Sequence, residues 1–456
     1  MADENNSSQS ATLGAQNETT GAQSVHKRLN LRGKGNAFTE YNQTGFARLQ
    51  DDENVERLCV LDEDVNSGLY LVHYTDENDE YATDVGQYRG VIFDKNSNDP
   101  LHRVVAASQP LTPEYNLGTE GGFRAKLDAF GNGGVEITRA YEGTVLRLFY
   151  HNKGDNAFLP DDQQGGWYLS TYKRVDGRRS RWSAKPFGTY FTELFVDDYE
   201  QNKDVLDKNI CYTFLLSHQE NKIALDVPRN RLFYVMRWNI SEQKYETVRD
   251  DETFDSFKHV EIPEFIDVDF NNLQEELENV DVDTTSTGFL VTGYVNDDKN
   301  ILCVKYLYPS YVTDRNIRGN EPNLRMAYYH ALHTGQGEAF KRIMSDRSDD
   351  LVVFDKELDS VVEEIVSAYK RRFIDTEYCM FPKEFFSVLK KINDEYSEKY
   401  TNGNETERKS IVCQVLKQYN ARVLNACVKF VNELRSPKEE TKETTQNEQQ
   451  NNVDAE

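Results

Sequence analysis

The chain has 456 residues, with 78 acidic and 53 basic side chains and a formal net charge of −25. A chain of this length exceeds a usual single domain, so we expect two folded domains and tails. The acidity favours solubility and opposes indiscriminate binding to polyanions, so any contact with nucleic acid must be local. The sequence has no run of about 18 apolar residues and no secretory pattern at its start, so we expect no membrane partner.

The two ends of the chain are poor in apolar residues. We expect residues 1–36 and residues 437–456 to be disordered tails, because neither segment buries enough surface to offset the entropy lost on ordering. The six cysteines have no short paired spacing of the kind that binds zinc, and His330 and His333 lack a third ligand nearby. The sequence therefore predicts no metal site, and reduced thiols in a cytosolic or nuclear compartment.

The segment from residue 37 to residue 316 consists mostly of short runs of β-branched and aromatic residues separated by turn signals. Such runs are typical of strands, and the aromatic content of 12% favours stacked antiparallel sheets with a few helices. In residues 267–283, apolar side chains at helical spacing indicate a connecting helix. Strands are predicted in residues 68–74, 90–93, 145–150, 212–216, 231–238 and 301–307.

Beyond Gly319 the apolar residues recur at the spacing of helices. We expect an all-α domain over residues 317–436, which makes the chain an α+β protein with a body of antiparallel sheets and flanking helices, followed by helices alone. Residues 317–325 carry turn chemistry and are interpreted as the hinge, although Arg318 and Arg325 are also candidates to face a ligand cleft. The predicted helices are residues 324–332, 356–374 and 382–396, and one long helix over residues 405–434.

Residues 139–144, with the sequence Arg-Ala-Tyr-Glu-Gly-Thr, look like an active-site turn from which the nucleophile is missing. Covalent nucleotidyl transfer needs a lysine that attacks the α-phosphate of a nucleoside triphosphate, and carboxylates that hold metal and ribose. It also needs an aromatic shelf for the base and further lysines for the phosphates. A glycine in the nucleophile turn lets the backbone approach the nucleotide closely. This turn has the glutamate and the glycine but no lysine.

Several segments together resemble the RNA ligase 1 family of T-even bacteriophages, within the covalent nucleotidyltransferase superfamily. They are most similar to the divergent relatives in large eukaryotic DNA viruses such as iridoviruses. The resemblance runs from about residue 40 to residue 435 and implies a nucleotidyltransferase-like domain over residues 37–316. The segments that carry it are residues 89–93, 106–117, 140–144, 167–180, 212–223, 287–291 and 304–307.

Four positions depart from the family's pattern. Ala140 stands where the resemblance places the nucleophilic lysine, and an alanine methyl group cannot form a phosphoramidate with AMP. Leu215 and Thr287 stand in place of glutamates, and Leu307 in place of a second lysine. The resemblance still implies a nucleotide-binding set that keeps part of the expected chemistry, namely Arg89, Tyr141, Glu142, Gly143, Phe214 and Lys305.

Two lysines are candidates to replace the missing nucleophile. Lys126 begins a Lys-x-Asp-Ala sequence upstream of the turn, and Lys173 precedes an Arg-x-Asp-Gly sequence downstream of it. Arginine stays protonated and cannot attack, while Lys173 is one residue out of register, which on a strand points it to the other face. With either lysine in place we expect an active ligase that uses ATP and Mg²⁺. With both at the surface we expect no cofactor.

A basic cluster stands out in this acidic chain. It contains six cations against the single acid Asp176, and aromatic residues lie beside it, among them Trp167 and Trp182. Cations together with aromatic rings suit a groove that follows phosphates and stacks bases, so we expect single-stranded RNA as a partner. The alternative is a solvated basic face that pairs with the protein's own acidic segments. The basic cluster is Lys173, Arg174, Arg178, Arg179, Arg181 and Lys185.

Three hypotheses about function follow from the sequence. The first is a catalytically degenerate, RNA-ligase-like viral protein that is expressed early and binds RNA, or viral or host proteins, in the cytoplasm or nucleus of an infected cell. The second is an active ATP-dependent RNA or polynucleotide ligase that uses a displaced lysine. The third is an acidic scaffolding protein without nucleic acid.

Overall fold

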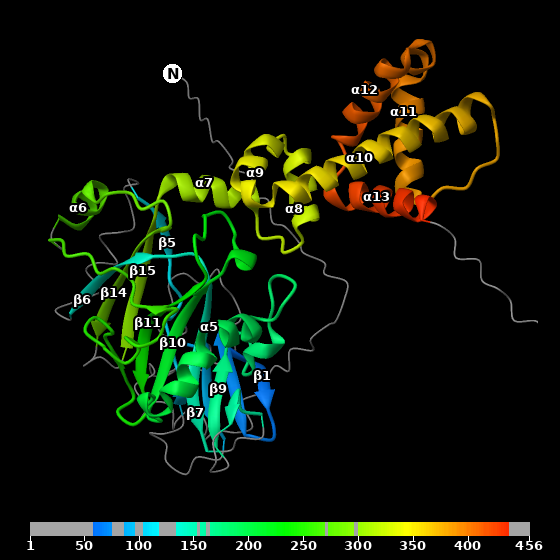
Figure 1. Ribbon diagram of the computed structural model, residues 1–456. Helices are drawn as coiled ribbons and strands as arrows, with labels where there is room; N and C mark the ends of the chain where they lie inside the picture. The colour runs from blue at the N-terminus through cyan, green and yellow to red at the C-terminus, as the bar shows by residue number, and fades with distance from the viewer. Residues whose placement is uncertain are drawn as a thin grey trace, which may run out of the picture.

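The computed structural model describes residues 58–74, 86–95, 104–117, 134–152, 156–160, 165–269, 272–295 and 300–436. The two predicted tails and Lys126 lie outside the described residues. Within them, strands dominate as far as residue 307 and helices follow (Figure 1). The predicted fold class, an α+β body of mostly antiparallel sheets with a helical C-terminal part, is confirmed.

The described strands form three sheets, and the first is antiparallel with its strands in chain order. Its two middle strands are almost wholly buried, which explains why they are continuous apolar runs rather than alternating ones. The strands are β1 (Leu58–Asp64), β2 (Leu69–Tyr74), β3 (Arg89–Asp94) and β4 (Val104–Ala106).

The central sheet has the strand order β12–β11–β10–β7–β9–β8, and β13 pairs in parallel with β11. Helix α5 (Phe187–Gln201) packs against it, with Phe191 and Phe195 edge-on to Phe214 of β10. The strands are β7 (Thr144–His151), β8 (Leu159–Pro160), β9 (Gly166–Ser170), β10 (Ile210–Ser217), β11 (Arg231–Asn239), β12 (Lys244–Glu246) and β13 (Val260–Glu261).

The third sheet has the order β5–β15–β14–β6, with β5 parallel to β15. Strand β6 ends at Ala140 and β7 begins at Thr144, so the turn between them carries the chain from the third sheet into the central one. Helix α6 (Leu273–Asn279) precedes β14. The strands are β5 (Glu114–Asn116), β6 (Val135–Ala140), β14 (Gly288–Val295) and β15 (Asn300–Leu307).

Helices alone follow β15. In Figure 1, α7, α8 and α9 lie across one end of the strands, and α10 to α13 extend beyond them to one side. A π-helical turn at Lys370–Ile374 follows α10. The helices are α7 (Pro309–Arg318), α8 (Leu324–His333), α9 (Gly337–Ile343), α10 (Ser348–Tyr369), α11 (Lys383–Asn402), α12 (Glu405–Leu416) and α13 (Ala421–Arg435).

The single long helix predicted over residues 405–434 was wrong. The chain breaks after α12, and the side chain of Asn420 caps α13 by accepting a hydrogen bond from the backbone N–H of Val423 (3.2 Å). Asparagine is a strong N-cap residue, and its local preference outweighed the continuous pattern. The spacing of apolar residues continues across the break because α12 and α13 bury their side chains in the same core, as Val415 and Leu424 show.

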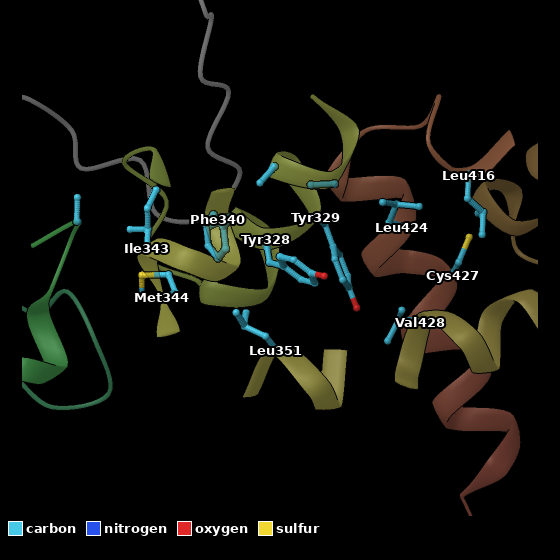
Figure 2. Packing of buried hydrophobic residues seen from close by; sticks show 14 of the residues in the cluster. Tyr328, Tyr329, Phe340, Ile343, Met344, Leu351, Leu416, Leu424, Cys427 and Val428 are labelled. Atoms are coloured by element: carbon cyan, nitrogen blue, oxygen red, sulfur yellow. The ribbon is translucent and has the colours of Figure 1, made fainter. Parts of the chain in front are cut away.

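One buried cluster joins the third sheet to the helices. Phe289 of β14 and Tyr306 of β15 belong to the same cluster as Tyr328 and Tyr329 of α8. Figure 2 shows the helical half of this cluster, where α8 packs against α13. No helix in the described part of the chain is long and apolar enough to cross a membrane.

Candidate functional site

Ala140, at the predicted nucleophile position, is a buried residue at the end of β6. It is 5% exposed, and its carbonyl oxygen accepts hydrogen bonds from the backbone N–H of Thr287 (2.7 Å) and from its hydroxyl (3.1 Å). Thr287 is the residue that stands in place of a glutamate, so its polar group is used to hold β6 against β14. Both substituted positions therefore have structural roles.

Glu142 is the next group of the turn, and its carboxylate serves the backbone. Its oxygens accept hydrogen bonds from three successive N–H groups, those of Ile223, Ala224 (2.9 Å) and Leu225 (2.9 Å). Burial raises the pKa of the Glu142 carboxyl above its ordinary value, while the three N–H donors and the charge of Lys222 oppose that rise. Because both oxygens are engaged, this carboxylate has little capacity left for a metal ion or a ribose.

Gly143 and Tyr141 also belong to the turn. A Cβ at Gly143 would collide with the carbonyl oxygen of Leu216, so only glycine allows this close approach to β10. The ring of Tyr141 stacks on Phe233, with 3.9 Å between the ring centroids, and the guanidinium of Arg231 lies over both rings. The face of the Tyr141 ring that stacks on Phe233 is therefore not open to a base.

Lys305 lies on β15 and shares a face of the third sheet with Ala140. Lys305 pairs with Leu290, and Leu290 pairs with Thr138, two residues before Ala140 on β6. Burial lowers the pKa of the Lys305 ammonium, and Arg89 and Arg315 lower it further against the opposing effect of Glu114. Among the described residues, none forms a hydrogen bond or an ion pair with its Nζ.

Arg89 brings a second cation near Lys305. Its guanidinium donates a hydrogen bond to the carbonyl oxygen of Pro110 (3.2 Å) and lies 4.3 Å above the ring of Tyr172. Arg147 of β7, fully buried, lies 5.9 Å from the same ring and donates to the carbonyl oxygen of Thr171 (2.7 Å). The structure thus places both guanidinium groups near the ring of Tyr172, with hydrogen bonds to backbone carbonyl groups.

Phe214 requires a correction. It is 0% exposed, and its ring packs against Phe191 and Phe195 beneath α5, with Phe254 on the other side. In that location it cannot form the shelf for a bound base. The sequence pattern placed it on the right strand, but its side chain points into the aromatic core, so we leave it out of the nucleotide-binding set.

The basic cluster is largely neutralised by carboxylates of the protein itself. Asp62 of β1 pairs with Arg174 (3.2 Å) and Arg179 (3.5 Å). Arg178 pairs with Asp176 and Lys185 with Glu193, both at 2.9 Å. These pairs favour the alternative that the sequence left open, a basic face matched by acidic segments.

Two members of the cluster differ from the rest. Lys173, one of the two rescue candidates, is exposed on the loop after β9, outside the buried turn at Ala140. Arg181 is exposed and forms no ion pair with any described residue. It lines a cavity, to which Arg318 also contributes.

A cavity of about 610 Å³ lies where the body meets the helices, and no local sequence pattern predicts it as a whole. Arg318, from the predicted hinge, is 3% exposed there, and its Nη1 donates to the carbonyl oxygen of Glu321 (2.8 Å). Burial lowers the pKa of the Arg318 guanidinium. The lining residues are Arg181, Trp182, Ser183, Ala184, Gln219, Glu220, Lys222, Arg318, Pro322, Asn323, Leu324, Arg325, Met344, Asp346, Arg347 and Phe354.

A comparison with curated proteins shows a partial similarity. No family model matches the chain. An immediate-early protein ICP-46 homolog of invertebrate iridescent virus 3 is 29% identical over 119 residues, which is 25% of this chain. The match spans 24% of the relative's own length.

Solved structures of ligases show weaker likenesses. A mutant RNA ligase of Naegleria gruberi, with AMP and Mn, is 14% identical with a TM-score of 0.27, over 41% of this chain and 54% of the ligase. An archaeal ATP-dependent RNA ligase is 10% identical with a TM-score of 0.30, over 80% of this chain and 68% of the ligase. At such identities and TM-scores, neither likeness extends an activity to this chain.

Proposed function

We propose that this chain is a catalytically degenerate, RNA-ligase-like protein of a large DNA virus that binds single-stranded RNA and does not join it. The observation that carries the loss of catalysis is Glu142, whose carboxylate accepts hydrogen bonds from the backbone N–H groups of residues 223–225. Ala140 beside it has no amine, and Thr287 is bonded to the carbonyl oxygen of Ala140. A turn with these bonds stabilises the fold and has no group that could attack phosphorus.

The partial similarity to an iridescent virus immediate-early protein supports the viral part of this proposal. By the same reasoning we propose expression early in infection, and a place of action in the host cytoplasm or nucleus. Viral or host proteins are further candidate partners. The net charge of −25 restricts RNA to local basic surfaces, so binding should be selective rather than indiscriminate.

Labelling with nucleotide tests the loss of catalysis. The protein is incubated with ATP or GTP labelled at the α-phosphate and with Mg²⁺ or Mn²⁺, then denatured and separated on a gel. We expect no label on the protein, because no amine occupies the nucleophile turn. A covalent label that acid releases would overturn the proposal.

Filter binding tests the RNA-binding half of the proposal. A single-stranded RNA is titrated with the protein at about 50 mM and about 200 mM salt. We expect binding that weakens at the higher salt, because phosphate contacts release counterions. No binding at the lower salt would favour an acidic scaffolding protein instead.

One observation favours the second candidate, an active ligase with a displaced lysine. Lys305 is half-buried on the same sheet face as Ala140, has a lowered pKa and lacks a carboxylate partner among the described residues. Such a lysine is a better nucleophile than an exposed one such as Lys173. If label were found, peptide mapping would decide between Lys126, Lys173 and Lys305, and ATP and Mg²⁺ would be the cofactors.

A further inference from the structure

The cavity between the body and the helices is strongly basic for so acidic a chain. Five of its lining residues are basic and two, Glu220 and Asp346, are acidic. The body contributes Arg181 and Lys222, and the helical part contributes Arg318, Arg325 and Arg347. Counted over the lining residues alone, the cavity has an excess of three positive charges, so the cations among them that lack a carboxylate partner are the candidates to meet an anion.

Three of these cations already have carboxylate partners. Lys222 pairs with Asp226 (2.8 Å) and Asp346 (2.6 Å). Arg325 pairs with Glu357 at 3.0 Å, and Arg347 pairs with Asp350 at 2.7 Å. These ion pairs hold the three side chains in place and largely neutralise their charge, so they contribute little to the binding of an anion.

Arg181 and Arg318 have no ion pair with a carboxylate among the described residues. Arg318 is 3% exposed, yet its Nε is buried without an acceptor. A buried guanidinium N–H without an acceptor is unfavourable, and an anion in the cavity would supply the missing acceptor. Planar guanidinium groups bind phosphate through paired N–H donors, which Arg318 from the helical side and Arg181 from the body side provide.

The cavity also has aromatic walls. Trp182 follows Arg181 on the body side, and Phe354 of α10 lies on the helical side with the guanidinium of Arg325 at 5.1 Å from its ring centroid. Aromatic rings and guanidinium planes are the surfaces on which nucleic-acid bases stack. The volume of about 610 Å³ lies within the range of small-molecule sites.

We propose that this cavity binds a nucleoside phosphate, with the phosphate on Arg181 and Arg318 and the base against Trp182 and Phe354. The ligand is either the phosphorylated end of a single-stranded RNA or a free mononucleotide, which share this chemistry. An RNA end as the ligand depends on the proposed RNA-binding function, whereas a free mononucleotide as the ligand does not. Because the two sides of the cavity come from the body and from the helices, the ligand also links the two parts.

Fluorescence anisotropy on the full chain tests this site. The probes are single-stranded RNAs of about ten nucleotides with a 5′-phosphate, with a 3′-phosphate or with hydroxyls at both ends, and AMP is the competitor. We expect one of the two phosphorylated RNAs to bind about tenfold more tightly than the RNA with hydroxyls at both ends, because its terminal phosphate adds charge-assisted hydrogen bonds. If AMP binds as tightly as the RNA with the preferred terminal phosphate, the free mononucleotide is the ligand.

Two variants locate the site, and two more serve as matched controls. Arg181→Gln and Arg318→Met should each remove the preference for a terminal phosphate. Arg435→Gln and Lys409→Gln each remove one exposed positive charge outside both the cavity and the basic cluster, and should change binding less than about twofold. Arg181 is exposed, so Arg181→Gln keeps the test valid if Arg318→Met does not fold.

The outcomes separate this inference from the proposed function. If RNA binds equally well with and without a terminal phosphate, and equally well to the Arg181 and Arg318 variants, the cavity site is overturned and the RNA-binding function stands. AMP binding that is lost in Arg181→Gln, without RNA binding, would support the cavity and overturn the RNA function. If neither AMP nor any RNA binds, the cavity inference is wrong.

Discussion

Glu142 has a structural role in this fold. In the turn that the sequence singled out, its carboxylate holds the backbone N–H groups of residues 223–225, and it is 7% exposed. A carboxylate that accepts several N–H donors in a buried place stabilises the segment that supplies them. The segment leads directly from Lys222, so this one side chain also positions a wall of the basic cavity.

We expect Glu142→Gln to destabilise the fold by about 2–3 kcal/mol. The amide retains one oxygen acceptor but turns an NH₂ group toward backbone N–H donors, which leaves buried donors without acceptors. Urea denaturation followed by circular dichroism measures the difference. Glu338→Gln is the control, since that side chain is 94% exposed and should change stability by less than about 0.5 kcal/mol. Equal effects of the two substitutions would contradict the structural role of Glu142.

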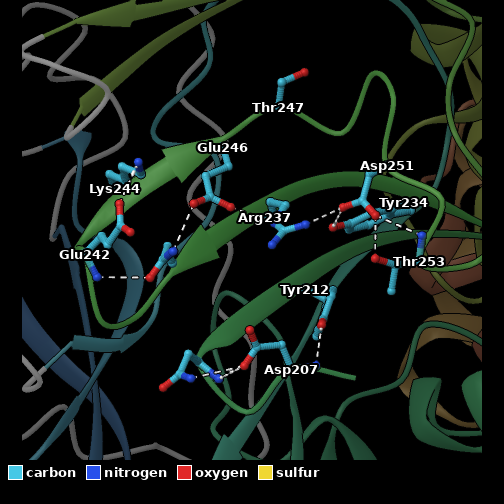
Figure 3. A network of polar contacts seen from close by, with 12 residues as sticks. Asp207, Tyr212, Tyr234, Arg237, Glu242, Lys244, Glu246, Thr247, Asp251 and Thr253 are labelled. Atoms are coloured by element: carbon cyan, nitrogen blue, oxygen red, sulfur yellow. Dashed lines mark hydrogen bonds and ion pairs between the residues drawn. The ribbon is translucent and has the colours of Figure 1, made fainter. Parts of the chain in front are cut away.

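At the scale of elements, a polar network fastens β11 to the segment that follows β12 (Figure 3). Asp251 accepts hydrogen bonds from Tyr234 (3.0 Å), from Arg237 (2.6 Å) and from Thr253. Burial acts to raise the pKa of the Asp251 carboxyl, but these hydrogen bonds outweigh it and the pKa is lowered. The network therefore contributes stability only while Asp251 is ionised.

The pH dependence of Asp251→Asn tests this network. The folded-state pKa lies below the unfolded value of about 3.9, so the stabilisation is present above that value and is lost as pH falls through the folded-state pKa. We expect the variant to be less stable than the wild type by about 1–3 kcal/mol at neutral pH. The difference should shrink between about pH 5 and about pH 2. A stability difference between the variant and the wild type that stays constant over this pH range would rule out a stabilising role of ionised Asp251.

The elements show what could be predicted from the sequence. The change from strand to helix was predictable because the apolar period changes from that of strands to that of helices near Gly319. The break between α12 and α13 was missed because the apolar stripe continues through it, and only the cap at Asn420 marks it. Phe214 was placed on a strand correctly, but which face of that strand meets α5 depends on long-range packing.

The candidate site was predictable only in part. The alanine at position 140 is visible in the sequence, whereas the acceptor role of Glu142 needs residues 223–225, far away along the chain. The basic cavity combines a loop after β9, a loop after β10 and the start of α8, and no local pattern brings these segments together. The ion pairs of Asp62 with Arg174 and Arg179 likewise depend on contacts between distant strands.

At the scale of the whole molecule, the body and the helices are joined by a shared core and by a buried cation. Phe289 and Tyr306 of the third sheet lie in one hydrophobic cluster with Tyr328 of α8. The side chain of Lys222 is 3% exposed and pairs with Asp346, from the turn before α10. Burial acts to lower the pKa of Lys222, but its two aspartates outweigh it and the pKa is raised, so the cation is kept protonated.

We expect Asp346→Asn to weaken the junction by about 1–2 kcal/mol, less than the loss of a sole partner because Asp226 remains with Lys222. Urea unfolding measures the loss, and limited proteolysis should cut earlier at the junction. Asp314→Asn is the control: Asp314 pairs with the exposed Arg342 within the helical part, and its loss should leave the junction intact. Identical proteolysis of both variants would argue against Lys222 as a tether.

The bonds around Ala140 leave little room for a charged side chain at that position. Ala140→Lys would place an amine beside Thr287 and Glu142, whose polar groups already hold the backbone. The new charge would enter a place that is 5% exposed, and burying a charge there would destabilise the fold. Installing nucleotidyl transfer at this turn would therefore require several coordinated substitutions, because any one of them alone would give only a less stable protein.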